Sequence, residues 1–318
     1  MVIPVLQFVI SSVYLGLSLF VLVKGADIFL TKAKQIGSSL GLSHFAIGIL
    51  IVAFGTSLPE LASSIVAVLR GSTEIVIANV IGSNITNILF IVGLLALLTG
   101  RIAVDHSLVK TELPIFFIAT ALFAMSIGDG SVDRLEALLL LGTFCTYVWY
   151  LFFEAPTDKS LGAATHAHSP INPTNIGYAL FGLCGILVGA HYTVEMTVDI
   201  ATLFSVPVGL VTIAAIAFGT SLPELFVSLQ AMRSGEVELA IGNIFGSNAF
   251  NLLVVIGLPA LIKPLTAEPA ILAFGLPVLI AASAIFFVTG LSRQIMRWEG
   301  MMMLLFFVFF IIKLVSVV

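Results

Sequence analysis

The sequence predicts an all-α polytopic membrane protein with ten transmembrane helices in two inverted five-helix repeats. The first observation is composition: the 318-residue chain is 59% hydrophobic and only 9% charged, whereas a soluble domain carries roughly a quarter charged residues. The second is the presence of about ten apolar stretches near the 20 residues that a membrane span needs. The third is an internal repeat at one constant spacing. Together they exclude a soluble enzyme or a nucleic-acid-binding domain.

The apolar stretches divide the chain into two halves of five. A polar segment at 154–175, which contains Pro and His residues, is the one long linker, so we expect a first repeat at 1–153 and a second at 176–318. The first apolar run has no basic region before it and no clear cleavage site after it, which favours a span over a signal peptide. The predicted spans are 3–24, 43–69, 75–98, 112–128, 134–153, 176–200, 206–232, 238–262, 269–290 and 299–317.

The repeat sets the predicted topology. The sequence GTSLPE at 55–60 recurs at 219–224, an offset of 164 residues. The same offset relates GSN at 82–84 to GSN at 246–248, and Asn87 to Asn251. Five predicted spans separate equivalent positions, and because five is odd the second half must be inverted relative to the first. Inverted repeats are a common plan of secondary transporters, whose substrate site lies between the repeats near the midplane.

The basic residues of the loops predict the orientation, because cytoplasmic loops carry an excess of Lys and Arg. With both termini outside, nine basic residues fall inside and four outside, which favours this arrangement and places the 154–175 linker in the cytoplasm. The short loops fit the plasma (inner) membrane of a prokaryote. The inside set is Lys24, Lys32, Lys34, Arg101, Lys110, Lys159, Arg233, Arg293 and Arg297, and the outside set is Arg70, Arg134, Lys263 and Lys313.

Each GTSLPE block predicts a broken helix lined with oxygen ligands. Gly55 and Pro59 weaken the helix near its middle, and broken backbone at membrane depth is tolerated only where it lines a cavity or is buried in protein. Free carbonyls, the hydroxyls of Thr56 and Ser57 and the carboxylate of Glu60 would all be available to a cation. The second copy supplies the equivalent groups on Thr220, Ser221 and Glu224.

Two intramembrane carboxylates point to a cation site. Each costs on the order of 3 kcal/mol on insertion scales, and Glu60 and Glu224, brought together by the inverted symmetry, repel unless they are protonated or share a cation. Two carboxylates with neutral oxygens suit Ca²⁺, which takes 6–8 oxygen ligands, or Na⁺ ions dividing the same oxygens, better than Mg²⁺. The absence of a His/Cys cluster disfavours soft transition metals.

Neutral side chains of the second motif extend the predicted site. Ser83 and Asn87 lie four residues apart, on one helical face, as do Ser247 and Asn251. They add oxygens without charge, so the formal charge of the site is −2, from the two glutamates. The alternative role for the asparagines is hydrogen bonding between helices, and for the GTSLPE pair it is simple helix kinking.

These paired motifs resemble the α-repeats of the Na⁺/Ca²⁺ exchanger family, of prokaryotic type, within the cation/Ca²⁺ exchanger superfamily. The resemblance covers essentially the whole chain and implies ten helices in two inverted halves. It also implies Glu60 and Glu224 as central Ca²⁺ ligands. Many members carry Asp at the position of Asn87 or Asn251, where this chain has Asn in both halves. The further ion ligands that it implies are Thr56, Ser57, Ser83, Thr220, Ser221, Ser247, the carbonyls of Ala53 and Ala217, and the closing Asn87 and Asn251.

The leading functional hypothesis is a secondary antiporter that exports Ca²⁺ in exchange for Na⁺ by alternating access at one shared site. The first spans of each half, 3–24 and 176–200, carry few polar residues at midplane depth and are expected to slide across the ligand-bearing helices. We expect no enzymatic activity and no cofactor. The expected partners are Ca²⁺, Na⁺ and the lipid bilayer, with no nucleic acid, and the expected state is a monomer.

Other functions remain open at this point. A Ca²⁺/H⁺ antiporter would protonate Glu60 and Glu224 in turn, although that branch typically shows G-N-x-T-E in place of GTSLPE, and a K⁺-dependent Na⁺/Ca²⁺ exchanger is a further variant. An intramembrane protease using Ser57 or Ser221 would need a base, and His191, the only histidine in the interior of a predicted span, has no equivalent beside Ser57. A passive cation channel is disfavoured because discrete two-carboxylate sites favour tight binding over rapid conduction.

Overall fold

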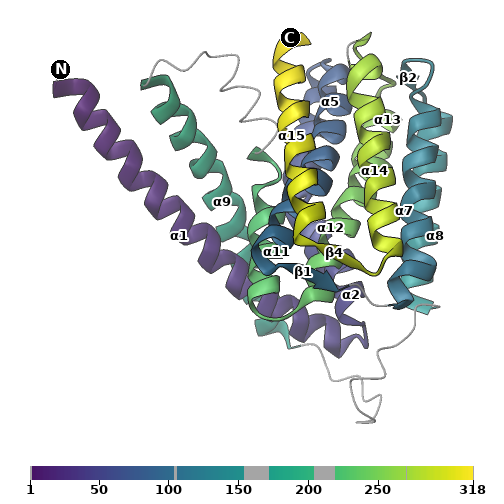
Figure 1. Cartoon of the computed structure of the whole chain (residues 1–318), viewed down its shortest axis with the longest axis horizontal. Coiled ribbons are helices and arrows are strands. Elements are labelled where there is room, and N and C mark those ends of the chain that lie inside the picture. Colours follow the sequence, from purple (N-terminus) through teal and green to yellow (C-terminus); the bar gives the residue numbers. More distant parts are fainter. Residues whose placement is uncertain (1, 104–105, 154–171, 204–218, 270, 318) are drawn as a thin grey trace.

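The structure, a computed structural model, describes residues 2–103, 106–153, 172–203, 219–269 and 271–317. It is mostly helical, and the two ends of the chain lie at the same end of the molecule (Figure 1). In the described part of the chain, five helical segments are long and apolar enough to cross a membrane, and one bent pair of helices makes a sixth. Helical segments occupy the described part of every predicted span.

Two long helices, α1 (Val2–Ser39) and α9 (Pro173–Leu203), pack side by side and slant away from the other helices (Figure 1). The sequence predicts a first span that ends at residue 24, and this boundary is wrong: α1 continues for another fifteen residues to Ser39. The chain leaves the helix at Gly41, whose φ of 74° is the left-handed conformation typical of a glycine after a helix C-terminus. Gly25 lies inside α1, where it packs against α9.

Glycines bring the backbones of α1 and α9 into close contact. A Cβ atom added at Gly25 would lie 2.7 Å from the backbone nitrogen of Ile186, and one added at Gly189 would lie 2.7 Å from the backbone nitrogen of Leu22. Small residues at helix contacts in membranes allow this approach. The two contacts are exchanged by the 164-residue offset, which converts Leu22 to Ile186 and Gly25 to Gly189.

The first GTSLPE block breaks its helix as predicted. A helical run formed by α2 (His44–Ile47), η1 (Gly48–Ala53) and α3 (Phe54–Thr56) ends at Ser57, and α4 (Leu58–Leu69) leaves at a bend of 43°. Pro59 is the second residue of α4, where its missing N–H has no intrahelical partner to lose. In the second half α11 (Leu222–Arg233) begins in the same way, with Pro223 as its second residue.

The second motif of each half lies on a helix with a π-helical middle. These helices pack with four others to form the main core. The first-half elements are α5 (Thr73–Ile85), η2 (Thr86–Val92), α6 (Gly93–Thr99), α7 (His106–Ser126) and α8 (Arg134–Phe153). The second-half elements are α12 (Val237–Phe250), η3 (Asn251–Val255), α13 (Ile256–Ile262), η4 (Ile271–Gly275), α14 (Leu276–Leu291) and α15 (Arg297–Val317).

Two short antiparallel strand pairs join the halves at opposite ends of the molecule (Figure 1). At one end β1 (Arg101–Ala103) pairs with β4 (Gln294–Met296), so that Arg101 faces Met296. At the other, β2 (Ser131–Val132) pairs with β3 (Leu265–Thr266), so that Val132 faces Leu265. Adding the offset of 164 to Arg101 gives Leu265, and subtracting it from Met296 gives Val132. The repeat therefore exchanges the two pairs in register.

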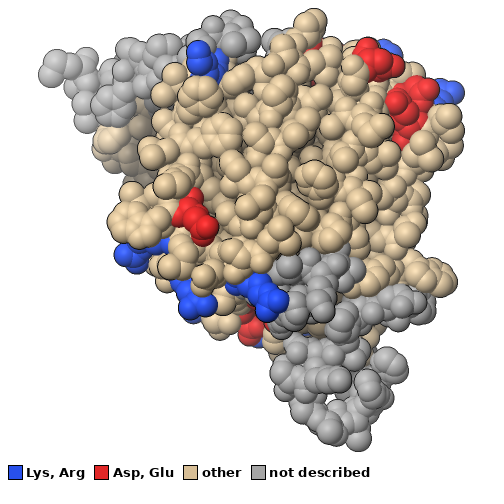
Figure 2. All heavy atoms as spheres, turned by 45° about the vertical axis from the view of Figure 1, so that its right-hand side comes forward, with Lys and Arg blue, Asp and Glu red and all other residues tan. Residues whose placement is uncertain are grey.

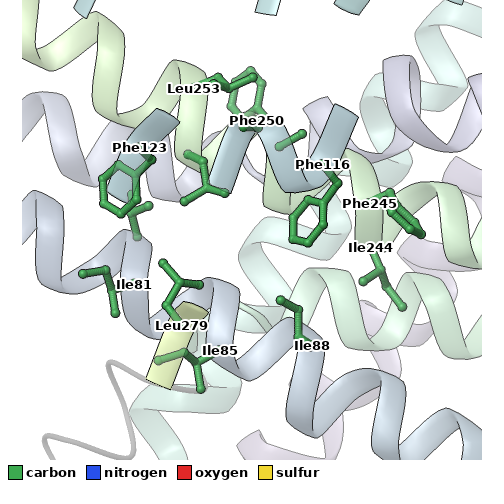
Figure 3. Close-up of a cluster of buried hydrophobic side chains, with 14 of the residues drawn as sticks. Ile81, Ile85, Ile88, Phe116, Phe123, Ile244, Phe245, Phe250, Leu253 and Leu279 are labelled. Carbon is green, nitrogen blue, oxygen red and sulfur yellow. The ribbon is translucent and has the colours of Figure 1, made fainter. Parts of the chain in front are cut away.

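Aromatic and aliphatic side chains from both halves fill the core between these helices (Figure 3). Phe116 of α7 contacts Phe245 of α12 edge to face, with ring centroids 5.7 Å apart, and Phe286 of α14 lies 4.7 Å from Phe245. Isoleucines of α5 and η2, including Ile81 and Ile88, complete the cluster. On the face seen in Figure 2, most charged side chains gather toward the two ends and leave a broad uncharged band between them, as expected for a surface that faces lipid.

Candidate ion-binding site

The two predicted carboxylates lie at the start of the helices that follow the breaks. Glu60 is in the first turn of α4 and Glu224 in the first turn of α11, and both side chains are 0% exposed. A carboxylate is stabilised near a helix N-terminus by the free N–H groups and the helix dipole. Ser57, three residues before Glu60, contacts the carboxylate of Glu224. The fold therefore brings the two copies of the motif together.

A hydrogen bond connects the two GTSLPE copies directly. Ser57 Oγ, from the first half, donates to Glu224 Oε1 at 2.9 Å, and Ser247 Oγ of α12 donates to the same oxygen at 3.2 Å. Ser57 occupies the N-cap position of α4, but its side chain makes no capping bond to its own helix. The Ser57 hydroxyl thus donates its hydrogen bond to the carboxylate of the opposite half and does not cap its own helix.

The remaining carboxylate oxygens are buried without a partner. Neither Oε1 nor Oε2 of Glu60, nor Oε2 of Glu224, has a hydrogen-bond partner among the described residues, and the same is true of Ser221 Oγ. A buried polar group left unsatisfied costs roughly 1–3 kcal/mol, and more when it is charged. Oxygens of this kind, three of them on two neighbouring carboxylates, are suited to coordinate a dehydrated hard cation.

Threonine and serine hydroxyls surround the carboxylates as two matching pairs. Thr56 Oγ1 lies 3.5 Å from Ser247 Oγ, and Thr220 Oγ1 lies 3.2 Å from Ser83 Oγ. The 164-residue offset exchanges these pairs, because it converts Thr56 to Thr220 and Ser83 to Ser247. Each pair joins the broken helix of one half to the second motif of the other, so all four hydroxyls lie at the junction of the halves.

Asn87 and Asn251 are buried, one helical turn beyond the serines. Asn87 is 1% and Asn251 is 0% exposed, and neither the amide nitrogen nor the oxygen of either side chain has a partner in the described structure. They lie at the beginning of the π-helical segments η2 and η3. Such segments occur frequently at functional sites. The four-residue spacing from Ser83 and Ser247 places each amide on the face that carries the serine.

Of the two predicted carbonyl ligands, one can be placed. Ala53 is buried, and its carbonyl oxygen lies 3.3 Å from Thr56 Oγ1 and accepts a hydrogen bond from the Ser57 backbone N–H at 3.0 Å. Ala217 lies outside the described residues. Among the described side chains, no group of three or more His, Cys, Asp or Glu comes together. The acidic groups of the site are therefore the two glutamates, accompanied by neutral oxygens.

Asn243 is a residue of the site that the sequence analysis missed. It is 0% exposed and contacts both Thr56 and Glu224. The signal was present in the sequence, because Asn79 precedes Ser83 by four residues and Asn243 precedes Ser247 by four, again at the offset of 164. Because this asparagine recurs in both halves on the same helical face as the serine, the sequence could have predicted it as part of the site.

Two cavities lie beside α1 and α9, and one of them reaches the candidate site. One of about 450 Å³ is lined by Pro59, Asn79 and Thr220, together with His191 and Glu195 of α9. It therefore reaches both GTSLPE blocks. The other, of about 570 Å³, is lined by the final turns of α1 and by Gln230 and Glu236, and by no predicted ion ligand. The site is thus approached from the cavity beside α9.

Charged residues hold the last turns of α1 against the second half. Lys34 of α1 forms an ion pair with Glu236, which lies between α11 and α12, and His44 Nδ1 lies 3.0 Å from the other Glu236 oxygen. Asp27 Oδ1 accepts a hydrogen bond from Gln230 Nε2 at 3.1 Å. These contacts close α1 against α11 at the cavity that lacks ion ligands.

Comparison with known proteins identifies the family. The sequence profile of the sodium/calcium exchanger protein family matches residues 10–153 and 174–315. The chain belongs to this family. The matched ranges contain both GTSLPE blocks and both G-S-N motifs, and leave out most of the predicted linker.

Relatives match this exchanger over nearly its whole length. The sodium/calcium exchanger MaX1 of Methanosarcina acetivorans is 34% identical, with 96% of this chain and 98% of the relative covered. The inner membrane protein YrbG of Escherichia coli is 31% identical over 87% of each chain. A solved structure of the sodium-calcium exchanger NCX_Mj, soaked with 2.5 mM Na⁺ and 10 mM Sr²⁺, aligns with a TM-score of 0.81 at 29% identity, covering 95% of this chain and 98% of that one.

Proposed function

We propose that this protein is a secondary antiporter that exchanges Na⁺ for Ca²⁺ at one site between its two halves. The observation that carries the proposal is the Ser57–Glu224 hydrogen bond, which joins the two GTSLPE copies around a pair of buried carboxylates. Family membership and the relatives named sodium/calcium exchanger support the choice of ions. Ca²⁺ leaves the cell as Na⁺ enters.

The ligands of the transported ions are taken from both halves. Glu60 and Glu224 hold Ca²⁺ at the centre, and hydroxyl, carbonyl and amide oxygens complete the shell that a large hard cation needs. The unpartnered oxygens of Glu60, Glu224, Asn87 and Asn251 support this assignment. The full set is Glu60, Glu224, Thr56, Ser57, Thr220, Ser221, Ser83, Ser247, Asn87, Asn251 and the carbonyls of Ala53 and Ala217.

Exchange follows from the charge of this ligand set. The empty site carries two negative charges, and moving them past an apolar barrier is costly. Ca²⁺ neutralises both, and Na⁺ ions that occupy the same oxygens do so as well, so only a loaded site changes its access. Because the two ions compete for the same ligands, the inward movement of one is coupled to the outward movement of the other.

We propose ten spans in two inverted halves as the frame for this movement. The strand pairs and the α1–α9 glycine contacts, each exchanged by the offset of 164, support an inverted two-fold relation. The tightly packed α1 and α9 slide together across the ligand-bearing helices and open one cavity as the other closes. In this arrangement both termini lie outside the cell. We also propose that the protein is a monomer in the inner membrane of a prokaryote.

Flux measurements in proteoliposomes test the proposal. Liposomes loaded with Na⁺ and diluted into Na⁺-free buffer should take up ⁴⁵Ca²⁺, and replacing Glu60 or Glu224 by Gln should abolish that uptake. Glu268→Gln, which alters an exposed carboxylate that is not among the proposed ligands, is the control and should transport normally. Uptake driven by a pH gradient without Na⁺ would instead establish Ca²⁺/H⁺ exchange, and a requirement for K⁺ would establish the K⁺-dependent variant.

A further inference from the structure

Asn243 links the two broken helices although it is not one of the proposed ion ligands. Its Oδ1 accepts a hydrogen bond from Thr56 Oγ1 at 3.2 Å, in the first half. Its Nδ2 donates to Ser228 Oγ at 2.9 Å and to the backbone oxygen of Glu224 at 3.4 Å, both on α11. Asn243 and Ser228 are each 0% exposed. A single side chain therefore spans the junction behind the carboxylates.

The partners fix the orientation of this amide. The backbone oxygen of Glu224 can only accept a hydrogen bond, so the amide nitrogen of Asn243 must face it and the amide oxygen must face Thr56. Asn243 Oδ1 is then the nearest acceptor for the single hydroxyl hydrogen of Thr56, and the Ala53 carbonyl is slightly farther, at 3.3 Å. With its hydrogen held there, Thr56 Oγ1 keeps its lone pairs free for a cation.

The matching residues of the other half lack this link. Ser64 occupies the position of Ser228, 164 residues earlier, and its buried Oγ has no hydrogen-bond partner in the described structure. Asn79 occupies the position of Asn243 and lines the cavity of about 450 Å³. The hydrogen-bonded link formed by Asn243 and Ser228 is therefore made on one side of the site, and neither residue lines that cavity.

We propose that Asn243, held by Ser228, is a positioning residue that orients Thr56 and the first turn of α11 for cation binding. The inference rests on the proposed function, since it assumes that Thr56 and Glu224 bind the transported ion. It adds two residues that touch no ion but set the affinity of the site. Substituting either one lowers Ca²⁺ affinity through Thr56 and Glu224 rather than by removing a ligand.

The repeat supplies a matched pair of variants. Ser228→Ala and Ser64→Ala remove the same hydroxyl from equivalent buried positions, but among the described residues only Ser228 has a partner to lose. Ser228→Ala should raise the KM for Ca²⁺ about five-fold, which corresponds to about 1 kcal/mol, the typical worth of one hydrogen bond. Ser64→Ala should leave KM nearly unchanged. Equal values of KM for the two variants would overturn the proposal.

A double-mutant cycle separates positioning from general stability. Asn243→Ala should weaken equilibrium binding of ⁴⁵Ca²⁺ to the purified, folded protein, and it should weaken it much less when Thr56 is already Ala, because contacting residues are coupled. An unchanged effect of Asn243→Ala in the Thr56→Ala background would refute the role. Absence of Na⁺-driven flux in the wild type would refute the proposed function instead, and the binding cycle would still decide the positioning role.

Discussion

Ser57 illustrates how a local signal is used for the site. Ser57, followed three residues later by Glu60, has the spacing of a capping box, in which the serine bonds to its own helix and the glutamate folds back to the serine. In the structure the Ser57 hydroxyl instead donates to Glu224 across the junction of the halves, and Glu60 keeps both oxygens unpartnered. The helix end gives up both bonds of the capping box, and the proposed ion site gains an oriented carboxylate.

Replacing Ser57 by Ala tests this contact. A hydrogen bond to a charged group is worth about 1.5–3 kcal/mol, so the variant should lose about ten-fold or more in apparent Ca²⁺ affinity. Ser63→Ala is the control on the same helix, because among the described residues Ser63 Oγ bonds to the backbone oxygen of Glu60, at 3.0 Å, and to no carboxylate. The measurement is the Ca²⁺ dependence of Na⁺-driven flux, and equal losses in the two variants would contradict the contact.

Asn251 offers a second test at the residue scale. Replacing it by Asp adds a third carboxyl group beside Ser247, and ionising that group changes the formal charge of the site from −2 to −3. The variant should resemble the wild type at low pH, where the new group is protonated, and bind Ca²⁺ more tightly as pH rises. Flux measured across a pH series should show a growing difference. Parallel pH profiles for the two proteins would place Asn251 away from the ions.

Helix breaks and helix ends differ in how far the sequence predicts them. The break at Ser57 was predictable because Gly55 and Pro59 act locally, through propensity and a missing donor. The end of α1 was not predictable, because the role of Gly25 inside the helix is set by a contact that exists only when α9 lies against it. Likewise, Glu60 and Glu224 were found by their cost in an apolar segment, whereas Asn243 acquires its role through partners in the other half.

The contact between α1 and α9 can be tested with a pair of glycine variants. Gly25→Ala would place a methyl group 2.7 Å from the backbone of α9 and 2.8 Å from its Gly182 carbonyl oxygen, so we expect a lower thermal unfolding temperature in detergent. Overpacking of this kind typically costs about 1–3 kcal/mol. Gly177→Ala on α9 meets nothing within 4 Å and should be neutral or slightly stabilising. Equal unfolding temperatures for Gly25→Ala and the wild type would argue against close packing.

Across the whole molecule, the exchanged strand pairs define two ends. α1 begins and α15 ends at the end that holds β2, and β1 and β4 lie at the other (Figure 1). The count of basic residues predicts that the first end lies outside. This prediction depends on charge alone, whereas the register of the strands depends on both halves being folded.

Cysteine labelling tests the assignment of the two ends. With Cys145 and Cys184 replaced by Ala, a single cysteine introduced at Glu268 should react in intact cells with a maleimide that cannot cross the membrane. One introduced at Ser38 should react only after the membrane is opened. The side chains of Glu268 and Ser38 are both exposed in the folded protein, so labelling at these positions should not depend on unfolding. The reverse pattern would invert the orientation while leaving the fold unchanged.

The exchanged strand pairs have a consequence for biogenesis. Each pair takes one strand from each half, so β1 and β2 leave the ribosome long before the strands that pair with them, and Ser57 is inserted before Glu224 exists. A fragment of residues 1–153 should therefore be inserted but rapidly degraded. Co-expressed with residues 172–318, it should persist and restore ⁴⁵Ca²⁺ flux, because both strand pairs can form between separate chains. The repeat that builds the site thus delays its completion until the second half has been made.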